Sequence, residues 1–486
     1  MAAGRSTERT GDRGAPGEAI AAGLDALSRW AGVLAWRDVP APVRRRVARG
    51  FADDLAAIVA ARREPELGAL TARLARASGP PEATLFDASG RRLDRYSAAL
   101  ANGSAADWCE LDGGYRKALC HAGLYCLPAV LAEGEAAGST LEAMLRALLV
   151  GYETVARVAR TFERADLALH PHGSLAAIGA TAAVTALRGH PPDTAAAAIS
   201  TAATLVSPGP FNHAVEGALV RNVWPGVGAA AGIRAVDFAE IGITGLATSL
   251  HDVQTVALGA AAHPDRLTRG LGAAWAVDDA YQKIHACCQY GHAAVEATLA
   301  LLDSRPHTDP ARDLRSVRVE THWRARKLDN VHPETTLAAK FSLQHILATT
   351  ALHGHAGAPA FHADTLSNPA IAALRDKVTI APFEPELGPP NDRPARVTWE
   401  IEDGSLVACE CSSARGGPDR PFTEAEIRSK IRGILIEPYP GLSGAVMEIM
   451  DLAPGVLARP WRETVAAAAG PPADRESARR SEGAHG

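Results

Sequence analysis

The sequence has few of the features that mark the common special classes of protein. Its 486 residues include only seven cysteines, none of them in a Cys-x-x-Cys pair, and aromatic residues make up 5%. Iron–sulfur clusters and disulfide-framed secreted domains both need a regular arrangement of thiols, so neither class is indicated. The formal net charge of −5 provides no basic excess for a nucleic-acid partner. We therefore expect a cytoplasmic protein with reduced thiols that binds no nucleic acid.

Long apolar runs and nucleotide motifs are lacking as well. No uninterrupted apolar stretch reaches the roughly 20 residues of a membrane span, and residues 1–17 contain no apolar core of a secretory signal. There is no P-loop, and a near match to a dinucleotide fingerprint at residues 226–232 has the wrong spacing. The pair His170 and His172 has no further ligands at metal-site spacing. The sequence thus predicts no membrane association and no metal.

What is present in the first half is helical patterning. Apolar residues recur at helical spacing over 139–160, where Ser139 and Glu142 have the spacing of a capping box. Residues 174–188 are rich in small residues such as Ala and Gly, which predicts a helix that packs closely against its neighbours at the centre of the fold. A further helix is predicted over 227–238.

The pattern changes after about residue 310. Val317 and Val319 alternate with polar residues as in a half-buried strand, and residues 395–402 and 406–411 flank the hairpin turn signal Asp403-Gly404. Helices are predicted near 342–352, 368–376 and from Thr423 onward, where Thr423 and Glu426 have the spacing of a second capping box. We predict a mainly α protein: a large discontinuous helical domain with an inserted smaller α+β lid domain. The predicted division is 1–16 disordered, 17–267 helical domain, 268–411 lid, 412–468 return of the helical domain, and 469–486 disordered.

Polar residues cluster at four places in this otherwise apolar chain. Taken singly, each cluster is most often a solvated loop or a surface charge. Together they make a cleft between the two domains plausible, since ligand sites commonly lie at domain interfaces. The clusters contain Glu110, Asp112, Tyr115 and His121; His170 and Ser174; Arg221; and Lys283 and His292.

At these clusters the chain resembles the MmgE/PrpD family, whose members include 2-methylcitrate dehydratase, cis-aconitate decarboxylase and iminodisuccinate epimerase. The resemblance runs from about residue 20 to 465. Residues 151–153 resemble the family's G-Y-E, and 170–175 (H-P-H-G-S-L) its H-P-T-G-T-L. Residues 281–294 (Y-Q-K-I-H-A-C-C-Q-Y-G-H-A-A) resemble Y-x-K-x-Y-P-C-C-x-x-x-H-A-A, and 340–345 (K-F-S-L-Q-H) resemble K-F-S-L-x-Y.

The resemblance implies a helical domain with an α+β lid, a homodimer, and an active site between the domains with no metal or organic cofactor. His121 and His170 match two active-site histidines of the family, Lys283 matches a lysine, and His292 a nearby histidine. The chain departs from the family at two positions. Arg221 stands where many members have a second lysine, and His345 stands where they have a tyrosine.

These residue types suit proton transfer at a carbon beside a carboxylate or carbonyl. Fixed cations stabilise the charge that builds up on the carboxylate oxygens, and a neutral imidazole is suited to take the proton near pH 7. We therefore predict a lyase acting on a small polycarboxylate or related organic anion, by loss of water or of CO₂. The alternatives are an isomerase or cyclase acting on a larger substrate in a specialised biosynthetic pathway, and a non-catalytic binding descendant. The candidate catalytic residues are His121, His170, Lys283, His345, Arg221 and Glu110, and the candidate substrate-binding residues are Asp112, His292, Ser174 and Tyr115.

Overall fold

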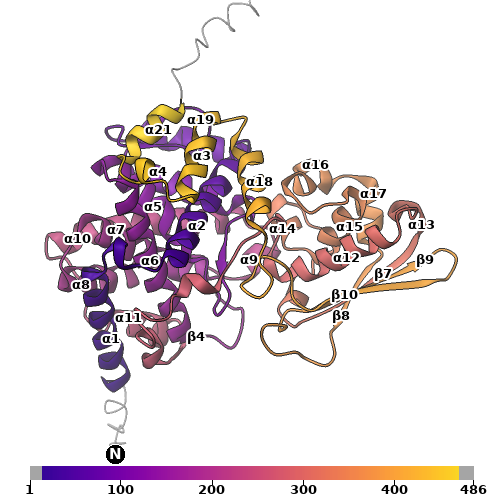
Figure 1. The fold of residues 1–486 in the computed structure, drawn as a ribbon. Helices are drawn as coiled ribbons and strands as arrows, with labels where there is room; N and C mark the ends of the chain where they lie inside the picture. Colours follow the sequence, from indigo (N-terminus) through magenta and orange to yellow (C-terminus); the bar gives the residue numbers. More distant parts are fainter. Residues whose placement is uncertain (1–13, 470–486) are drawn as a thin grey trace, which may run out of the picture.

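The computed structural model describes residues 14–469 and consists of a helical body with a smaller α+β part beside it (Figure 1). The first helix begins at Gly14, so it includes the last residues of the predicted N-terminal segment; residues 1–13 and 470–486 lie outside the described range. The principal helices of the body's first part are α1 (Gly14–Val33), α2 (Ala41–Ala60), α3 (Pro65–Ala77), α4 (Arg95–Trp108), α5 (Ala122–Ala137), α6 (Leu141–Thr161), α7 (Pro171–Arg188), α8 (Pro192–Ala203) and α10 (Trp224–Glu240).

Helix α7 lies at the centre of the body and contacts α5, α6, α8 and α10. Its small residues allow the close approach that the sequence predicts. A Cβ added at Gly228 of α10 would lie 2.4 Å from the Cβ of Ala176, and one added at Gly226 would lie 2.1 Å from the Leu100 carbonyl oxygen of α4. Helix α10 can approach α7 and α4 this closely only because Gly228 and Gly226 carry no side chain.

Helix α6 differs from the prediction at its start. Its N-cap is Thr140, whose hydroxyl accepts a hydrogen bond from the Ala143 N–H at 3.3 Å, one residue later than the predicted Ser139. A hydroxyl at either position fits the N-cap preference, so sequence alone does not separate them. The capping box predicted at Thr423 and Glu426 is confirmed.

The α+β part is built on one four-stranded sheet in the order β10-β9-β7-β8. Strands β7 (Leu314–Thr321) and β8 (Val378–Pro382) are parallel, whereas β9 (Ala395–Ile401) and β10 (Leu406–Cys411) form the predicted hairpin, with Gly404 at φ 85°. Helices α12 (His292–Ser304), α15 (Leu343–His353) and α17 (Pro369–Arg375) accompany this sheet and share a separate apolar core with it.

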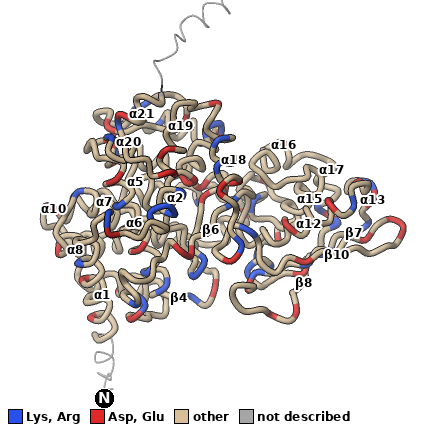
Figure 2. Tube along the Cα trace, in the orientation of Figure 1, with Lys and Arg blue, Asp and Glu red and all other residues tan. Residues whose placement is uncertain are grey.

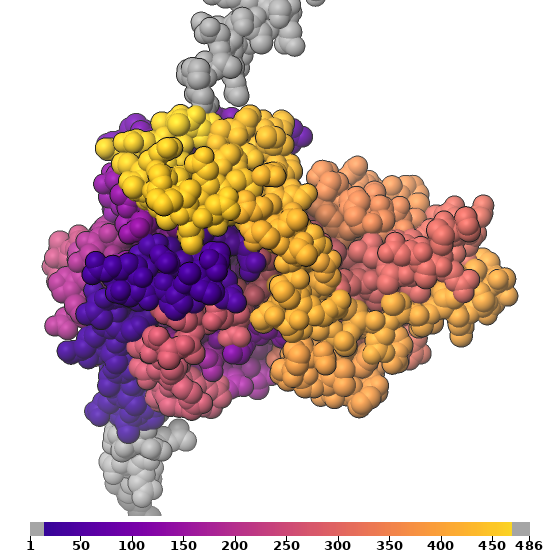
Figure 3. All heavy atoms as spheres, in the orientation of Figure 1, coloured from indigo at the N-terminus to yellow at the C-terminus, as the bar shows by residue number. Residues whose placement is uncertain are grey.

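The C-terminal helices return to the body, as Figures 1 and 3 show in yellow. Helices α18 (Glu424–Leu435) and α19 (Pro440–Met450) pack on α2, and α21 (Trp461–Ala469) packs on α5. Trp461 is fully buried and meets Phe51 edge to face, with ring centroids 5.6 Å apart. The mainly α fold with an inserted α+β part is therefore confirmed.

Charges of both signs are interspersed along the chain (Figure 2). Within residues 14–469, no helix combines the length and apolar character that a bilayer crossing requires.

Candidate active site

Two short strands bring the first and last polar clusters together. After α4 ends at Trp108, the chain passes through Glu110 in the left-handed region, at φ 51°, and enters β3 (Gly114–Tyr115). Strand β3 pairs antiparallel with β6 (Ala280–Tyr281), so that Gly114 lies opposite Tyr281. A Cβ at Gly114 would lie 2.3 Å from the Tyr281 hydroxyl oxygen, so the glycine makes room for this ring. Lys283 follows two residues after Tyr281 and reaches the carboxylates that precede β3.

These carboxylates form a buried ion-pair network. Lys283 Nζ lies 3.0 Å from Glu110 and 3.5 Å from Asp112, and Arg221 lies 2.7 Å from Glu110 and also binds Asp107. Each of these side chains is at most 2% exposed. Three carboxylates face two cations in this network.

The pKa shifts of these groups indicate which of them are charged. Burial raises the pKa of Glu110, but Lys283 and Arg221 outweigh it and hold the value at about 2. Burial lowers the pKa of Lys283, but Asp112 and Glu110 raise it well above its usual value. The pKa of Asp107 is raised well above the normal range by burial, which Arg221 only partly opposes. The site therefore keeps a charged lysine beside ionised Glu110.

Asp107, Glu110 and Asp112 also place one carboxylate oxygen each within 4.8 Å of one another, a spacing that could hold a metal ion. Lys283 and Arg221 already neutralise this group from within the protein. The donor set as it stands therefore fits an ion-pair network better than a metal centre.

His121 is held as one half of a carboxylate–imidazole pair. It is the N-cap residue of α5, and its Nδ1 lies 2.6 Å from the Asp112 carboxylate. A carboxylate at this distance favours the proton on Nδ1, which leaves the Nε2 lone pair available as a base.

His170 is the N-cap residue of α7 and lies directly against Arg221. Its Nε2 is 3.2 Å from a guanidinium nitrogen, and its ring stacks on Phe211. Burial, together with the positive charge of Arg221, lowers the pKa of His170 well below its usual value. His170 is therefore neutral at physiological pH.

A small cavity of about 40 Å³ joins these groups. The body contributes Glu110, Tyr115, His121, His170 and Arg221 to its wall, and residues beyond 280 contribute Lys283, Tyr290, Phe341 and Arg393. The six predicted residues Glu110, Tyr115, His121, His170, Arg221 and Lys283 are thus brought to one hollow. Asp112 lies behind His121 as its hydrogen-bond partner.

Three predicted residues lie elsewhere. His345 faces away from the cavity, since its Nε2 contacts the Thr365 hydroxyl at 3.3 Å and its Nδ1 contacts Arg375. His292 binds the Cys287 carbonyl at 3.1 Å at the start of α12. Ser174 lines a separate outer cleft instead. None of these three side chains lines the inner cavity, and their roles remain predictions.

The outer cleft has a volume of about 770 Å³ and adjoins the inner cavity, with which it shares Leu119, Pro171, Tyr290 and Arg393 among its lining residues. It carries more cations than anions. The cations are Arg116, Lys117, Arg160, Arg164, Arg266, Arg269, Arg324 and Arg393, and the anions are Glu163, Asp166, Asp279, Asp392 and Asp419. The approach to the inner cavity is therefore suited to an organic anion.

Sequence reasoning missed several residues of the site. His172 is fully buried, with Asp107 at 3.0 Å and the Tyr125 hydroxyl at 2.9 Å. Asp107 opens the first polar cluster of the sequence, which was a usable signal. Phe341 stands in the 340–345 motif, which offered a signal, whereas nothing in the local sequence distinguishes Arg393 from other arginines.

The comparisons with known proteins agree with the fold. The MmgE/PrpD N-terminal domain model matches residues 25–266, and the MmgE/PrpD C-terminal domain model matches residues 285–450. The cis-aconitate decarboxylase-like protein oryM of Aspergillus oryzae is 27% identical over 368 residues, which cover 70% of this chain and 76% of that protein. The chain belongs to the MmgE/PrpD family.

Proposed function

We propose that this protein is a cofactor-independent lyase that transfers a proton at a carbon beside a carboxylate or carbonyl of an organic polyacid. The observation that carries the proposal is the convergence of His121, His170, Lys283 and Arg221 on one buried cavity next to a cationic cleft. Membership of the family and similarity to a protein named as decarboxylase-like support the same class of reaction.

In the proposed reaction His121 acts as the base. Asp112 holds its Nδ1 at 2.6 Å, so Nε2 takes the proton from the substrate carbon. The electron pair left on that carbon spreads onto the adjacent carboxylate, where Lys283 and Arg221 stabilise the added charge. Arg221 can grip a carboxylate through two N–H groups, which a lysine cannot do.

The electron pair then forms a double bond as the neighbouring C–O bond breaks, and the departing hydroxyl takes the proton now held on His121 Nε2 and leaves as water. In the decarboxylation variant His121 carries the proton at the start: a C–C bond breaks to release CO₂, and the resulting carbanion takes the proton from His121 Nε2. His170 is neutral and its Nε2 accepts from Arg221, so we assign it to positioning the guanidinium.

Purified protein incubated separately with citrate, 2-methylcitrate and cis-aconitate tests the proposal. Loss of water is followed by NMR, and release of CO₂ by trapping. Turnover of one of these by the native protein, at least 10²-fold reduced in His121→Ala with the same thermal midpoint, is the expected result. Equal turnover by the native protein and His121→Ala would refute the assignment of the base.

A larger substrate is the second candidate, and the dimensions of the site favour it. The inner cavity of about 40 Å³ is close to the volume of a single water molecule, while the adjoining cleft is nearly twenty times larger. A substrate that places only its reacting carboxylate inside would extend into this cleft. Faster turnover of a 2-alkyl citrate with a long chain than of citrate itself would support an enzyme of this kind. If no acid tested exchanges hydrogen with D₂O although it binds, a binding protein is indicated instead.

A further inference from the structure

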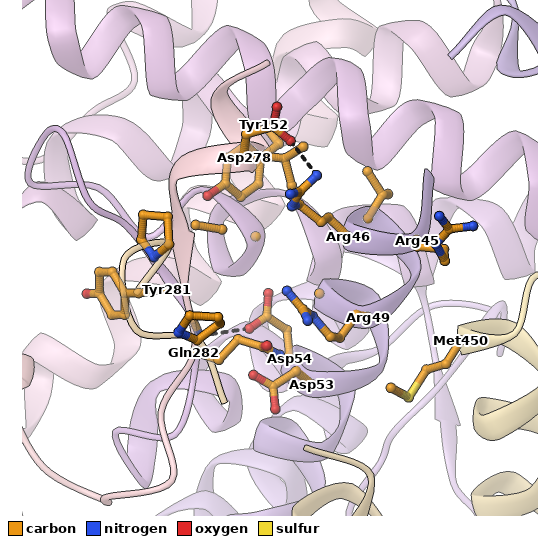
Figure 4. Close-up of a pocket in the computed structure, with 18 of the residues that line it drawn as sticks. Arg45, Arg46, Arg49, Asp53, Asp54, Tyr152, Asp278, Tyr281, Gln282 and Met450 are labelled. Carbon is orange, nitrogen blue, oxygen red and sulfur yellow. Dashed lines mark hydrogen bonds and ion pairs between the residues drawn. The ribbon is translucent and has the colours of Figure 1, made fainter. Parts of the chain in front are cut away.

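Besides the inner cavity and the outer cleft, a further pocket lies next to strands β3 and β6, and the proposed reaction makes no use of it (Figure 4). This rear pocket has a volume of about 640 Å³ and is lined by α2, α6, residues 277–282, residues 416–421 and parts of α18 and α19. Gly113, Gly114 and Tyr281 separate it from the inner cavity, since the glycines line the rear pocket and Tyr281 lines both.

Most charges around the rear pocket are already paired. Arg46 binds Asp278 at 2.8 Å, Arg428 binds Glu424 at 2.9 Å, and Asp53 binds Lys430 at 2.7 Å. Because each of these pairs joins one cation and one anion, the pairs carry no net charge and need no further counter-ion.

Two arginines of the lining, Arg45 and Arg49, form no ion pair or hydrogen bond with any residue in the range 14–469, and Arg45 is exposed to solvent. Arg49 is half-buried and projects from α2 into the hollow in Figure 4. Burial lowers the pKa of Arg49, which means that its charge is poorly solvated. Asp54 does not neutralise it, because burial and then Asp53 raise the pKa of Asp54 to about 8.

Two neutral donors in the wall also lack partners. The Tyr152 hydroxyl and the Gln282 side-chain nitrogen are buried and have no hydrogen-bond partner among the described residues. Tyr152 is 7% exposed, and both residues line the rear pocket. Buried polar groups are normally satisfied, so two unpartnered donors in the same pocket wall as an unpaired cation indicate a missing acceptor.

The rest of the wall is apolar. Val47, Leu148, Leu149, Val277 and Met450 line it. A pocket of this size, mostly apolar with a few convergent polar groups, is typical of small-molecule sites.

We infer that the rear pocket is a second ligand site, which binds a monoanionic carboxylate carried on an apolar body. The carboxylate accepts from Arg49, Tyr152 and Gln282, and the apolar body contacts Leu149 and Met450. One half-buried unpaired guanidinium with two neutral donors matches a single negative charge, whereas a phosphate dianion would remain under-compensated, since the second unpaired arginine, Arg45, is exposed to solvent. This site is independent of the proposed reaction.

Isothermal titration with 2-naphthoate tests the inference, with 2-naphthamide as the neutral isostere. We expect one saturable site per chain for the acid and at least tenfold weaker binding of the amide. Arg49→Met should weaken binding of the acid at least tenfold, and Tyr152→Phe several-fold. Arg44→Met is the matched control on the same helix, since Arg44 does not line the pocket, and should bind as the native protein does.

His121→Ala locates the probe. If it binds 2-naphthoate like the native protein, the probe occupies the rear pocket and not the inner cavity. Failure of 2-naphthoate to bind at millimolar concentration, equal binding of acid and amide, unchanged binding in Arg49→Met, or loss of binding in His121→Ala would each overturn the inference. Should Arg49→Met not fold, Tyr152→Phe and the amide decide the question.

Discussion

Removing the buried lysine of the active site should destabilise the whole protein. In Lys283→Met the side chain keeps its apolar length but loses the charge that lies 3.0 Å from Glu110 and 3.5 Å from Asp112. Both carboxylates are at most 2% exposed, so water cannot replace the ammonium. Breaking a buried ion pair by removing one partner costs about 3–5 kcal/mol. We expect a loss of this size in the free energy of unfolding at pH 7.

Urea unfolding of the native and variant proteins, followed by circular dichroism, measures the effect. The double variant Lys283→Met/Glu110→Gln removes one of the stranded charges together with the lysine. It should be more stable than Lys283→Met alone, and the resulting coupling should exceed about 1 kcal/mol. Arg29→Met, which breaks an exposed pair with Asp25, is the control and should leave the free energy of unfolding nearly unchanged.

The pH dependence adds a second constraint. The folded pKa of Glu110, about 2, lies below its ordinary value of 4.5, so ionised Glu110 contributes stability above pH 4.5 that is lost as the pH falls toward 2. Without Lys283 this contribution shrinks, and the stabilities of native protein and variant should converge in acid. A loss under 1 kcal/mol at pH 7, or a difference between the two proteins that does not change with pH, would show that the network is not held by charge.

Three further predictions concern other parts of the molecule. Asp112→Asn should reduce turnover about 10³–10⁴-fold with little change in KM, because an amide no longer selects the His121 tautomer with a free Nε2; an activity near that of the native protein would rule out the pair. Asp54→Asn should flatten the pH dependence of stability. Because the pKa of Asp54 is raised to about 8, the native protein should lose up to about 1.4 kcal/mol of unfolding free energy per pH unit between pH 4 and 8. Urea titrations at several pH values would measure this slope, which should be missing in the variant. Of the ten exposed large apolar residues in the described range, seven lie between residues 205 and 256, so we expect this surface to bury itself in a homodimer; Ile241→Glu with Leu246→Glu should sediment as a monomer, and a native protein that is itself monomeric would contradict the expectation.

Much of the fold was predictable because it is written in local periodicity. The Asp403-Gly404 hairpin and the helix predicted from Thr423 onward depend on neighbouring residues alone, and both are found. The N-cap of α6 was placed one residue early, because Ser139 and Thr140 offer equivalent hydroxyls.

The same difference between local patterns and long-range placement applies to the residues of the site. His121, His170, Arg221 and Lys283 stand in recognisable motifs, and they converge. His345 stands in one too, yet its ring turns toward Thr365 and Arg375, because a motif fixes a residue's place on a helix and not the direction that packing leaves open. Arg393 reaches the cavity from a lid loop, a long-range placement that no local pattern encodes.

Gly226 and Gly228 do not line the inner cavity, yet they control its geometry because they allow α10 to cross α4 and α7 closely. Asp107 lies near the end of α4, His170 caps α7, and Arg221 lies just before α10. The guanidinium therefore spans three helices whose separation is set by the absence of a side chain at Gly226 and Gly228. A single extra methyl at either glycine would push the helices apart by more than a hydrogen bond tolerates. The position of the Arg221 guanidinium therefore depends on the absence of these two side chains.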